Sequence, residues 1–284
     1  MGKRRGGVSG LARFLQTSNE ENAAEIPEPD VRPAKKRKTT ENGFVPLENV
    51  SDSQWIQNYD ATGMVPHYTD RSQVPEHLQK YFAQRTRFLS LYSLGCLLDE
   101  EGWFSITPEL VADRIAERCR CDTILDAFCG VGGNAIAFAK TCERVIALDI
   151  SPTRLALARH NAQIYGVADR IEFILSDYIS FANSYLSIRG GTSARKIDVV
   201  FLSPPWGGPG YISGDTTRPS SPTKPDASTP AAEHPSYTLA SIQPIHGADL
   251  FHLSRRITRN VAYYLPRNTR LEEISALLAD PPGG

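Results

Sequence analysis

The sequence has no apolar run near the roughly 20 residues that a membrane-spanning helix needs. Its first ten residues, MGKRRGGVSG, also lack the apolar stretch of a secretory signal peptide. Its five cysteines are scattered without a C-x-x-C pair, a pattern that indicates neither a disulfide framework nor a zinc site. We therefore expect a soluble intracellular protein with reduced thiols and no bound metal.

The first quarter of the chain is basic and poor in apolar residues. The stretch RPAKKRK holds four consecutive basic residues, Lys35 to Lys38, among many Glu, Asn, Ser and Pro. Such a composition does not offset the entropy of ordering, so residues 1–70 are predicted to be a disordered tail. A Lys/Arg-rich run is typical of a nuclear-import signal or of a tail that contacts nucleic acid, and a merely solvated charge run is the alternative. We expect a nuclear protein, with nucleolar and some cytoplasmic presence.

A helical extension is predicted over residues 75–120. Apolar residues recur at helical spacing from Pro75 to Gly102, which indicates one amphipathic helix or two. Another helix is predicted to begin with Thr107 as its N-cap and Pro108 at its first position.

From residue 121 to the end, β and α patterns alternate. Apolar strand patterns cover residues 123–128, 144–150, 171–175, 197–202 and 261–265, and helical patterns cover 132–142, 151–166, 249–260 and 269–279. This alternation predicts an α/β fold, a parallel sheet with helices on both faces, whose ligands bind beyond the carboxyl ends of the strands. A Ser/Thr/Pro-rich segment at 213–235 interrupts the rhythm, and we interpret it as a flexible insertion, with a functional lid as the alternative.

The stretch LDAFCGVGGN places an acid and three glycines between a strand and a helix. Asp126 would repel the pyrophosphate of a dinucleotide, whereas it suits the ammonium and sulfonium of S-adenosyl-L-methionine. Gly130, Gly132 and Gly133 allow the cofactor to approach the backbone closely. Asp149 ends the next strand, where a carboxylate can accept hydrogen bonds from ribose hydroxyls. The alternative is that both acids only cap the helices that follow them.

The stretch SPPW follows the fourth predicted strand. The Ser203 hydroxyl and the Pro204 carbonyl can accept hydrogen bonds from an exocyclic amine, and Trp206 can stack on the ring that carries it. This arrangement suits methyl transfer to an amine, in which catalysis is mostly positioning of the reacting atoms. A Pro-Pro turn beside a buried tryptophan is the structural alternative.

Five stretches resemble a known family: KYFAQR, EGWFSITPE, DAFCGVGGN, SPPWGGPGY and YYLPRN. They are similar to the catalytic domain of the trimethylguanosine synthase family, Rossmann-like class I methyltransferases that convert an RNA 7-methylguanosine cap to the 2,2,7-trimethyl form. The resemblance runs from about residue 80 to 280. It implies methyl transfer from S-adenosyl-L-methionine to guanosine N2 on capped small nuclear and small nucleolar RNAs, with proteins of their ribonucleoprotein particles as partners.

The resemblance also implies roles for single residues. Trp206 would stack on the methylated guanine, with Ser203 and Pro204 at its N2 amine. Lys80 and Arg267 would hold the cap phosphates. The residues matching the cofactor site are Ser105, Thr107, Asp126, Asp149 and Asp177.

Two departures from the family pattern leave alternatives open. The insertion follows the SPPW stretch directly, and relatives continue into a C-terminal hairpin that is missing here. One alternative is another amine methyltransferase of the same fold, acting on adenine N6, ribosomal guanine N2 or protein glutamine. The other is a cap-binding or RNA-binding protein without catalysis.

Overall fold

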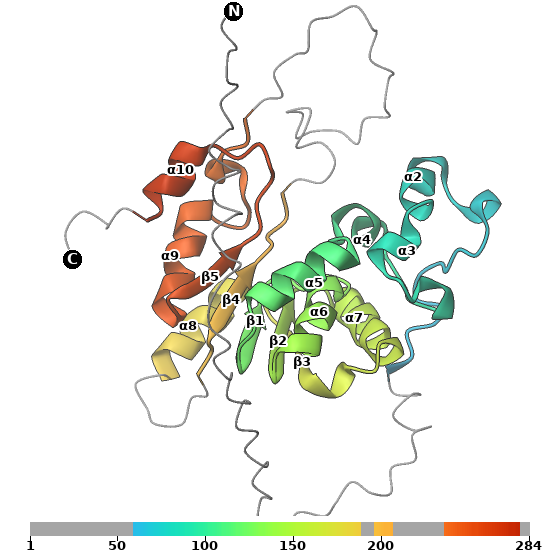
Figure 1. Cartoon of the computed structure of the whole chain (residues 1–284), viewed down its shortest axis with the longest axis horizontal. Helices are drawn as coiled ribbons and strands as arrows, with labels where there is room; N and C mark the ends of the chain where they lie inside the picture. Colours follow the sequence, from blue (N-terminus) through green and yellow to red (C-terminus); the bar gives the residue numbers. More distant parts are fainter. Residues whose placement is uncertain (1–58, 189–195, 207–235, 279–284) are drawn as a thin grey trace, which may run out of the picture. The chain divides into compact units, whose positions relative to one another are not determined.

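The computed structural model describes residues 59–188, 196–206 and 236–278 (Figure 1). The chain divides into two units, residues 1–49 and 50–284, and every described residue belongs to the second. Residues 1–58 of the predicted tail and the predicted insertion at 213–235 therefore lie outside the described residues.

The described residues form one parallel sheet with the strand order β3-β2-β1-β4-β5. The strands are β1 Thr123–Asp126, β2 Arg144–Asp149, β3 Ile171–Leu175, β4 Val199–Leu202 and β5 Asn260–Tyr263. Each falls within a predicted apolar run or within one residue of it, since strands covered on both faces need apolar side chains on both. The strand order reverses between β1 and β4, which makes their carboxyl ends the expected ligand crevice.

Helices cover both faces of the sheet, which confirms the predicted fold class (Figure 1). One face carries α5 Glu109–Arg118, α6 Gly133–Thr141 and α7 Pro152–Ile164, and the other carries α8 Tyr178–Ile188 and α9 Gly247–Ile257. Shorter elements are η4 Ala168–Arg170, η6 Leu239–Ser241 and α10 Leu271–Ala276. The side chains of the strands alternate between two apolar cores, one under each helix layer.

Local signals placed some helix ends correctly and one incorrectly. The Ser151 hydroxyl accepts a hydrogen bond from the Arg154 amide at 3.3 Å, and Pro152 opens α7 as predicted. At α5, however, Pro108 and not Thr107 is the N-cap. The predicted cap was wrong because the Thr107 hydroxyl instead accepts a hydrogen bond from the Asn134 side chain on α6, at 3.1 Å.

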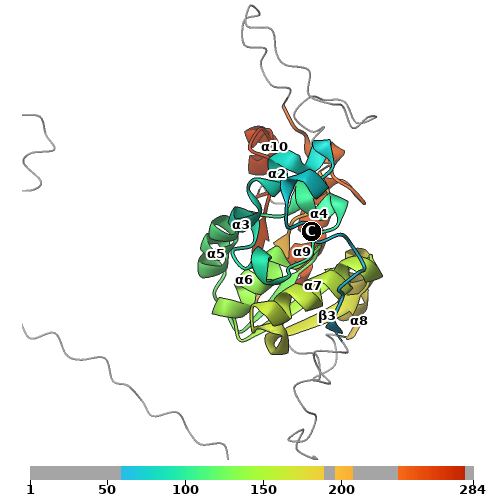
Figure 2. The same cartoon turned by 90° about the vertical axis from the view of Figure 1, so that its right-hand side faces the viewer.

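The helical extension is built of several short pieces and not of one or two helices. They are η1 Arg71–Gln73, η2 Glu76–Leu78, α2 Gln79–Phe82, α3 Arg85–Phe88, η3 Tyr92–Leu94 and α4 Glu100–Ser105. Gly95 ends η3 with a positive φ, and the Asp99 side chain caps a new helix. The pieces share an apolar core around Phe82, Tyr92 and Trp103. Figure 2 shows α2 beside α4 and α3 beside α5.

The predicted boundary of the disordered tail at residue 70 was placed too late. Ala61 is buried, and its amide donates a hydrogen bond to Nδ1 of His160 at 3.3 Å. The Tyr92 hydroxyl donates to the carbonyl of Tyr68 at 3.1 Å. Residues 59–70 thus pack against the fold through contacts that the composition of the segment does not indicate.

Helix α8 was not predicted from the sequence. Its buried Tyr178 and Ala182 lie four residues apart, the spacing of one helix face, and the Asp177 carboxylate accepts a hydrogen bond from the Ser180 amide at its start.

In the part of the chain that the structure describes, no helix is long and apolar enough to cross a membrane. The described residues add α10 but no further strand after β5, and the absence of a C-terminal hairpin stays a prediction.

Candidate functional site

Asp149 holds the glycine loop at the carboxyl end of β2. Its Oδ2 accepts a hydrogen bond from the Gly130 amide at 3.0 Å, and its Oδ1 accepts one from the Ser151 amide at 2.8 Å. The same carboxylate therefore contacts both the loop after β1 and the residue that caps α7. Because the N-cap of α7 is Ser151, Asp149 is not itself the cap of that helix.

Asp126 is a buried carboxylate with an unused oxygen. It ends β1 and is completely inaccessible to solvent. Its Oδ1 accepts a long hydrogen bond from the Phe128 amide at 3.4 Å, whereas its Oδ2 is buried with no hydrogen-bond partner. Burial raises the pKa of Asp126 to about 7, and the nearby Asp149 charge adds to the rise. A buried acceptor without a donor is costly, so this site fits a ligand that brings a cationic donor.

The three glycines of the loop have different requirements. Gly130 and Gly132 have positive φ values of 53° and 93°. A Cβ at Gly132 would lie 3.1 Å from Ala158, and one at Gly133 would lie 3.0 Å from Ile106. A Cβ at Gly130 would meet no atom within 4 Å. Gly132 and Gly133 thus allow close helix packing, and Gly130 faces the open space that a ligand could enter.

The other predicted cofactor residues differ in their surroundings. Thr107 is buried and contacts Asn134 at the start of α6. Ser105 is exposed, and its hydroxyl donates to the Glu101 carbonyl at 2.8 Å. Asp177 is exposed after β3, and hydrogen bonds from Ser180 lower its pKa. Thr107 therefore reaches the glycine helix, whereas the contacts of Ser105 and Asp177 are local.

Two further residues belong to this edge and were not predicted. The Oδ1 atom of Asn134 is buried without a hydrogen-bond partner, as is Oδ2 of Asp126. Ile150, directly after Asp149, leaves 71% of its surface exposed. An apolar residue following a strand-terminal acid, and an Asn following the paired glycines, were the available sequence signals.

The SPPW stretch lies next to the Asp126 loop because β4 pairs with β1. Asp126 and Phe201 are register partners, and the Ala127 amide donates to the Phe201 carbonyl at 3.0 Å. The Ser203 hydroxyl donates to the Phe128 carbonyl at 3.4 Å, and Pro204 is buried. The structure thus brings Ser203 and Pro204 to the same edge as Asp126.

Trp206 is half-buried and packs against Tyr264, the residue that directly follows β5. Its ring centroid lies 5.1 Å from that of Tyr264, with an interplanar angle of 45°. The Tyr264 amide donates to the Leu202 carbonyl at 2.8 Å, which places this tyrosine beside the end of β4. Tyr264 is thus an aromatic partner of Trp206 that the sequence did not indicate.

Lys80 and Arg267 are both exposed and come from distant parts of the chain. Lys80 lies on α2 with its ammonium 4.8 Å from the ring centroid of Tyr81, and Arg267 follows β5. Within the described residues, neither has a carboxylate at ion-pair distance. No described contact joins the two cations to each other or to Trp206.

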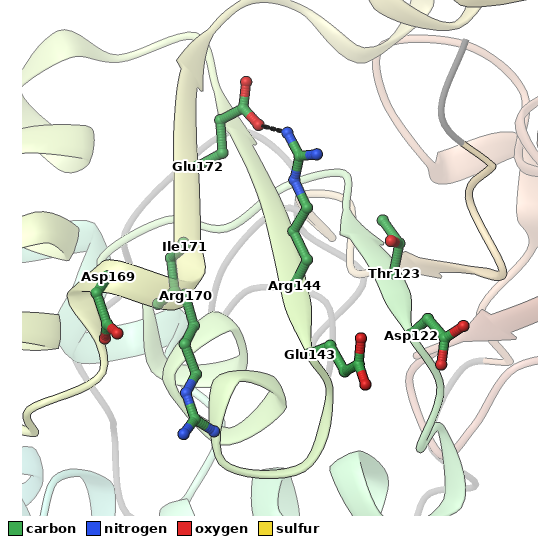
Figure 3. Close-up of a pocket in the computed structure, with 8 residues that line it drawn as sticks. All are labelled: Asp122, Thr123, Glu143, Arg144, Asp169, Arg170, Ile171 and Glu172. Atoms are coloured by element: carbon green, nitrogen blue, oxygen red, sulfur yellow. Dashed lines mark hydrogen bonds and ion pairs between the residues drawn. The ribbon is translucent and has the colours of Figure 1, made fainter. Parts of the chain in front are cut away.

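A hollow of about 470 Å³ lies at the opposite edge of the sheet (Figure 3). It is lined by the amino ends of β1, β2 and β3, and Figure 3 shows the Arg144 side chain paired with Glu172. It contains none of the predicted site residues, so the candidate site is the carboxyl edge and not this hollow. No group of side chains suited to a metal occurs in the described ranges.

Comparisons with known proteins show the family to which this chain belongs. A family model described as RNA cap guanine-N2 methyltransferase matches residues 121–218 and 231–282. The trimethylguanosine synthase of Schizosaccharomyces pombe is 38% identical over 208 residues, 72% of this chain and 76% of the relative. That of Saccharomyces cerevisiae is 32% identical over 205 residues, 70% of this chain and 57% of the relative.

Likeness to solved structures is weaker. A putative methyltransferase from Porphyromonas gingivalis W83 has a TM-score of 0.46 at 12% identity, covering 78% of this chain and 50% of that one, and adds nothing to the assignment. The family match, the two relatives and the parallel sheet decide it. This chain belongs to the RNA cap guanine-N2 methyltransferase family, enzymes that transfer a methyl group from S-adenosyl-L-methionine to the N2 amine of the cap guanosine.

Proposed function

We propose that this chain converts a 7-methylguanosine cap into the 2,2,7-trimethyl form on small nuclear and small nucleolar RNAs. One observation carries the proposal: the β1–β4 pairing and the Ser203–Phe128 hydrogen bond hold the SPPW stretch beside the unsatisfied carboxylate of Asp126. The name of the two yeast relatives supports the trimethylated product. Proteins of the corresponding ribonucleoprotein particles are the partners that we propose with it.

The cofactor would be held along the ends of β1 and β2. Asp126 would accept a hydrogen bond from its ammonium group, and Asp149 has lone pairs left for the ribose hydroxyls. Gly130 leaves room for the backbone approach, and the exposed Ile150 offers an apolar contact for the base. Ser105, Thr107 and Asp177 are the further residues that the family resemblance proposes for this site. When bound, the cofactor supplies an electrophilic methyl group on a sulfonium.

The substrate would be held along the end of β4. The Ser203 hydroxyl and the Pro204 carbonyl would accept hydrogen bonds from the N2 amine and so direct its lone pair. Trp206 would stack on the guanine, which is cationic when methylated at N7 and therefore suits a tryptophan face. Because the sulfonium leaves as a neutral thioether when its bond to the methyl group breaks, these residues would act by positioning, and the N2 amine would release one proton to solvent for each methyl group that it gains.

A methyl-transfer assay tests the proposal directly. Labelled S-adenosyl-L-methionine would be incubated with 7-methylguanosine diphosphate or with unmethylated GDP, and the products would be separated by methyl count. We expect mono- and dimethylation at N2 of the 7-methylated compound and little reaction with GDP. Equal use of GDP would favour another amine methyltransferase, and S-adenosylhomocysteine binding without any product would favour a non-catalytic cap-binding protein.

Replacing Lys80 or Arg267 with alanine is expected to flatten the salt dependence of cap binding. Each phosphate contact releases counterions, so losing one should reduce the slope of log K against log salt by about 1. The measurement is titration with 7-methylguanosine triphosphate from 50 to 200 mM salt. The 7-methylguanosine nucleoside, which carries no phosphate, is the control, since its affinity should stay nearly constant. Equal losses for nucleoside and triphosphate would remove the phosphate assignment.

We propose a nuclear location, supported by the RPAKKRK stretch alone. A fluorescent reporter fused to residues 1–70 is expected to enter the nucleus. Changing Lys35, Lys36, Arg37 and Lys38 to alanine should return it to the cytoplasm, while in-vitro methylation by the full chain carrying the same changes should be unaffected. Nuclear entry of the alanine variant would show that the run is not an import signal.

A further inference from the structure

The middle residue of the glycine loop is buried in the core of the helical extension. Val131 lies between Gly130 and Gly132 and is 4% exposed. It belongs to the same apolar cluster as Trp103 and the other core residues of the extension. A Cβ on Gly102 of α4 would come within 3.0 Å of Val131 Cγ1, so the two segments are in close contact. The loop proposed to hold the cofactor therefore has one wall supplied by the extension.

A single buried amide connects the same two segments. Asn161, on α7, is completely inaccessible to solvent. Its Oδ1 accepts a hydrogen bond from the Leu97 amide at 2.7 Å. Its Nδ2 donates to the Leu97 carbonyl at 2.9 Å and to the Val131 carbonyl at 3.0 Å. A carboxamide is suited to this position because it combines one acceptor with two donors on a short side chain.

A second link lies two turns earlier on the same helix. Arg154 Nε donates to Asp99 Oδ2 at 3.2 Å, and Asp99 Oδ1 accepts from the Gly102 amide at 2.8 Å. Positions seven residues apart share one helix face, so Arg154 and Asn161 both contact the extension from the same face of α7. Each group that their side chains hydrogen-bond lies between Leu97 and Gly102 or in the glycine loop.

We infer that Asn161 is a positioning residue that makes the helical extension part of the cofactor site. Bound cofactor restricts the motion of the loop around Val131. Because the Asn161 side chain hydrogen-bonds both Val131 and Leu97, it also restricts Leu97 and the apolar core of the extension, to which α2 belongs. Because coupling between two sites is reciprocal, ordering of the extension by the cap must in turn tighten cofactor binding. This inference rests on the proposed placement of the cofactor at the loop of residues 129–133.

Hydrogen exchange of the wild-type protein tests the coupling without any substitution. S-adenosylhomocysteine at saturation is expected to slow exchange in residues 92–98 severalfold, because the Leu97 amide is held by Asn161. Residues 250–257 of α9, on the other face of the sheet, are the internal control and should not change. Unchanged exchange at 92–98 with the ligand bound would overturn the inference alone. Failure of the wild type to bind the ligand would instead overturn the cofactor placement, and the inference with it.

Substitution of Asn161 by aspartate separates positioning from a general loss of stability. The carboxylate would still accept from Leu97 but would face two carbonyl oxygens in place of donating to them. At pH 8 the Asn161→Asp variant should bind S-adenosylhomocysteine roughly tenfold more weakly than wild type. As the pH is lowered, the difference in S-adenosylhomocysteine affinity between the variant and wild type should become smaller, because a protonated buried carboxyl regains one hydrogen-bond donor.

The matched control is Ser254→Ala. The Ser254 hydroxyl is buried on the opposite face and hydrogen-bonds the Tyr178 hydroxyl at 2.6 Å. Its loss should lower the melting temperature but leave affinity for S-adenosylhomocysteine within twofold of wild type at every pH. An Asn161→Asp variant within twofold of wild type at pH 8, or with a deficit that does not vary with pH, would overturn the positioning role.

Discussion

Replacing Asp126 with asparagine is expected to weaken S-adenosylhomocysteine binding by roughly 100-fold at pH 8 while stabilising the ligand-free protein. The carboxylate is fully buried, and its Oδ2 has no partner until a cationic ligand binds. Removing one partner of a buried ion pair costs about 3 kcal/mol or more, which corresponds to that change in affinity. In the ligand-free state the same buried charge has no compensating partner and destabilises the folded protein. Its removal should therefore raise the free energy of unfolding.

The pH dependence follows from the raised pKa of Asp126. Because the pKa of Asp126 is about 7 in the folded protein and the ordinary pKa of an aspartate is 3.8, the folded state holds a proton over that interval that the unfolded state has lost. The stabilising contribution is therefore full below pH 3.8 and is lost as the pH rises through about 7. Ligand binding requires the carboxylate, so affinity should fall by about tenfold per pH unit below 7 in the wild type and stay flat in Asp126→Asn.

Calorimetric titration with S-adenosylhomocysteine between pH 5.5 and 8.5, combined with thermal unfolding, measures both effects. Asp198→Asn is the matched control at the opposite edge of the sheet. The ion pair with Lys196 lowers the pKa of Asp198, so its loss should reduce stability above pH 4 without changing ligand affinity. An Asp126→Asn variant that binds within threefold of wild type would show that this carboxylate does not hold the ligand.

Replacing Trp206 with alanine is expected to weaken binding of 7-methylguanosine diphosphate by about 1 to 3 kcal/mol, or roughly 5- to 150-fold. The half-buried indole, packed against Tyr264, is the proposed stacking face for a cationic base. Trp206→Phe should lose less, since it keeps a smaller aromatic face. The loss should also be larger for 7-methylguanosine diphosphate than for GDP, because only the methylated base carries a positive charge.

The control for Trp206 is the affinity for S-adenosylhomocysteine in the same variants. The acids proposed to hold the cofactor, Asp126 and Asp149, end β1 and β2, whereas Trp206 packs on the core under α8 and α9 and against Tyr264. Cofactor affinity should therefore change less than twofold in Trp206→Ala. A parallel loss of both ligands would mean that the tryptophan holds the end of β4 in place and does not itself contact the cap.

The sheet was predictable because a strand buried on both faces leaves a continuous apolar run in the sequence. The runs at 123–128 and 144–150 each contain the acid that ends the strand, so Asp126 and Asp149 could be assigned to the carboxyl edge before any contact was known. Parallel pairing then brings such residues to one edge of the sheet. The adjacency of the SPPW stretch and Asp126 required only that β4 lie next to β1, a common order in doubly wound sheets.

Other features depended on partners distant in sequence. The short pieces of the extension, the packing of residues 59–70 and the pairing of Trp206 with Tyr264 all come from contacts across the fold. The same holds for Asn161. The sequence shows it only as a polar residue in a predicted helix, whereas its three hydrogen bonds reach segments 30 and 64 residues away. The sequence alone thus determined the strands, the acids at their ends and the family motifs, because these follow from local pattern. Tertiary structure decided which buried polar groups are satisfied, because each such group needs a partner that only the folded chain brings within hydrogen-bond distance.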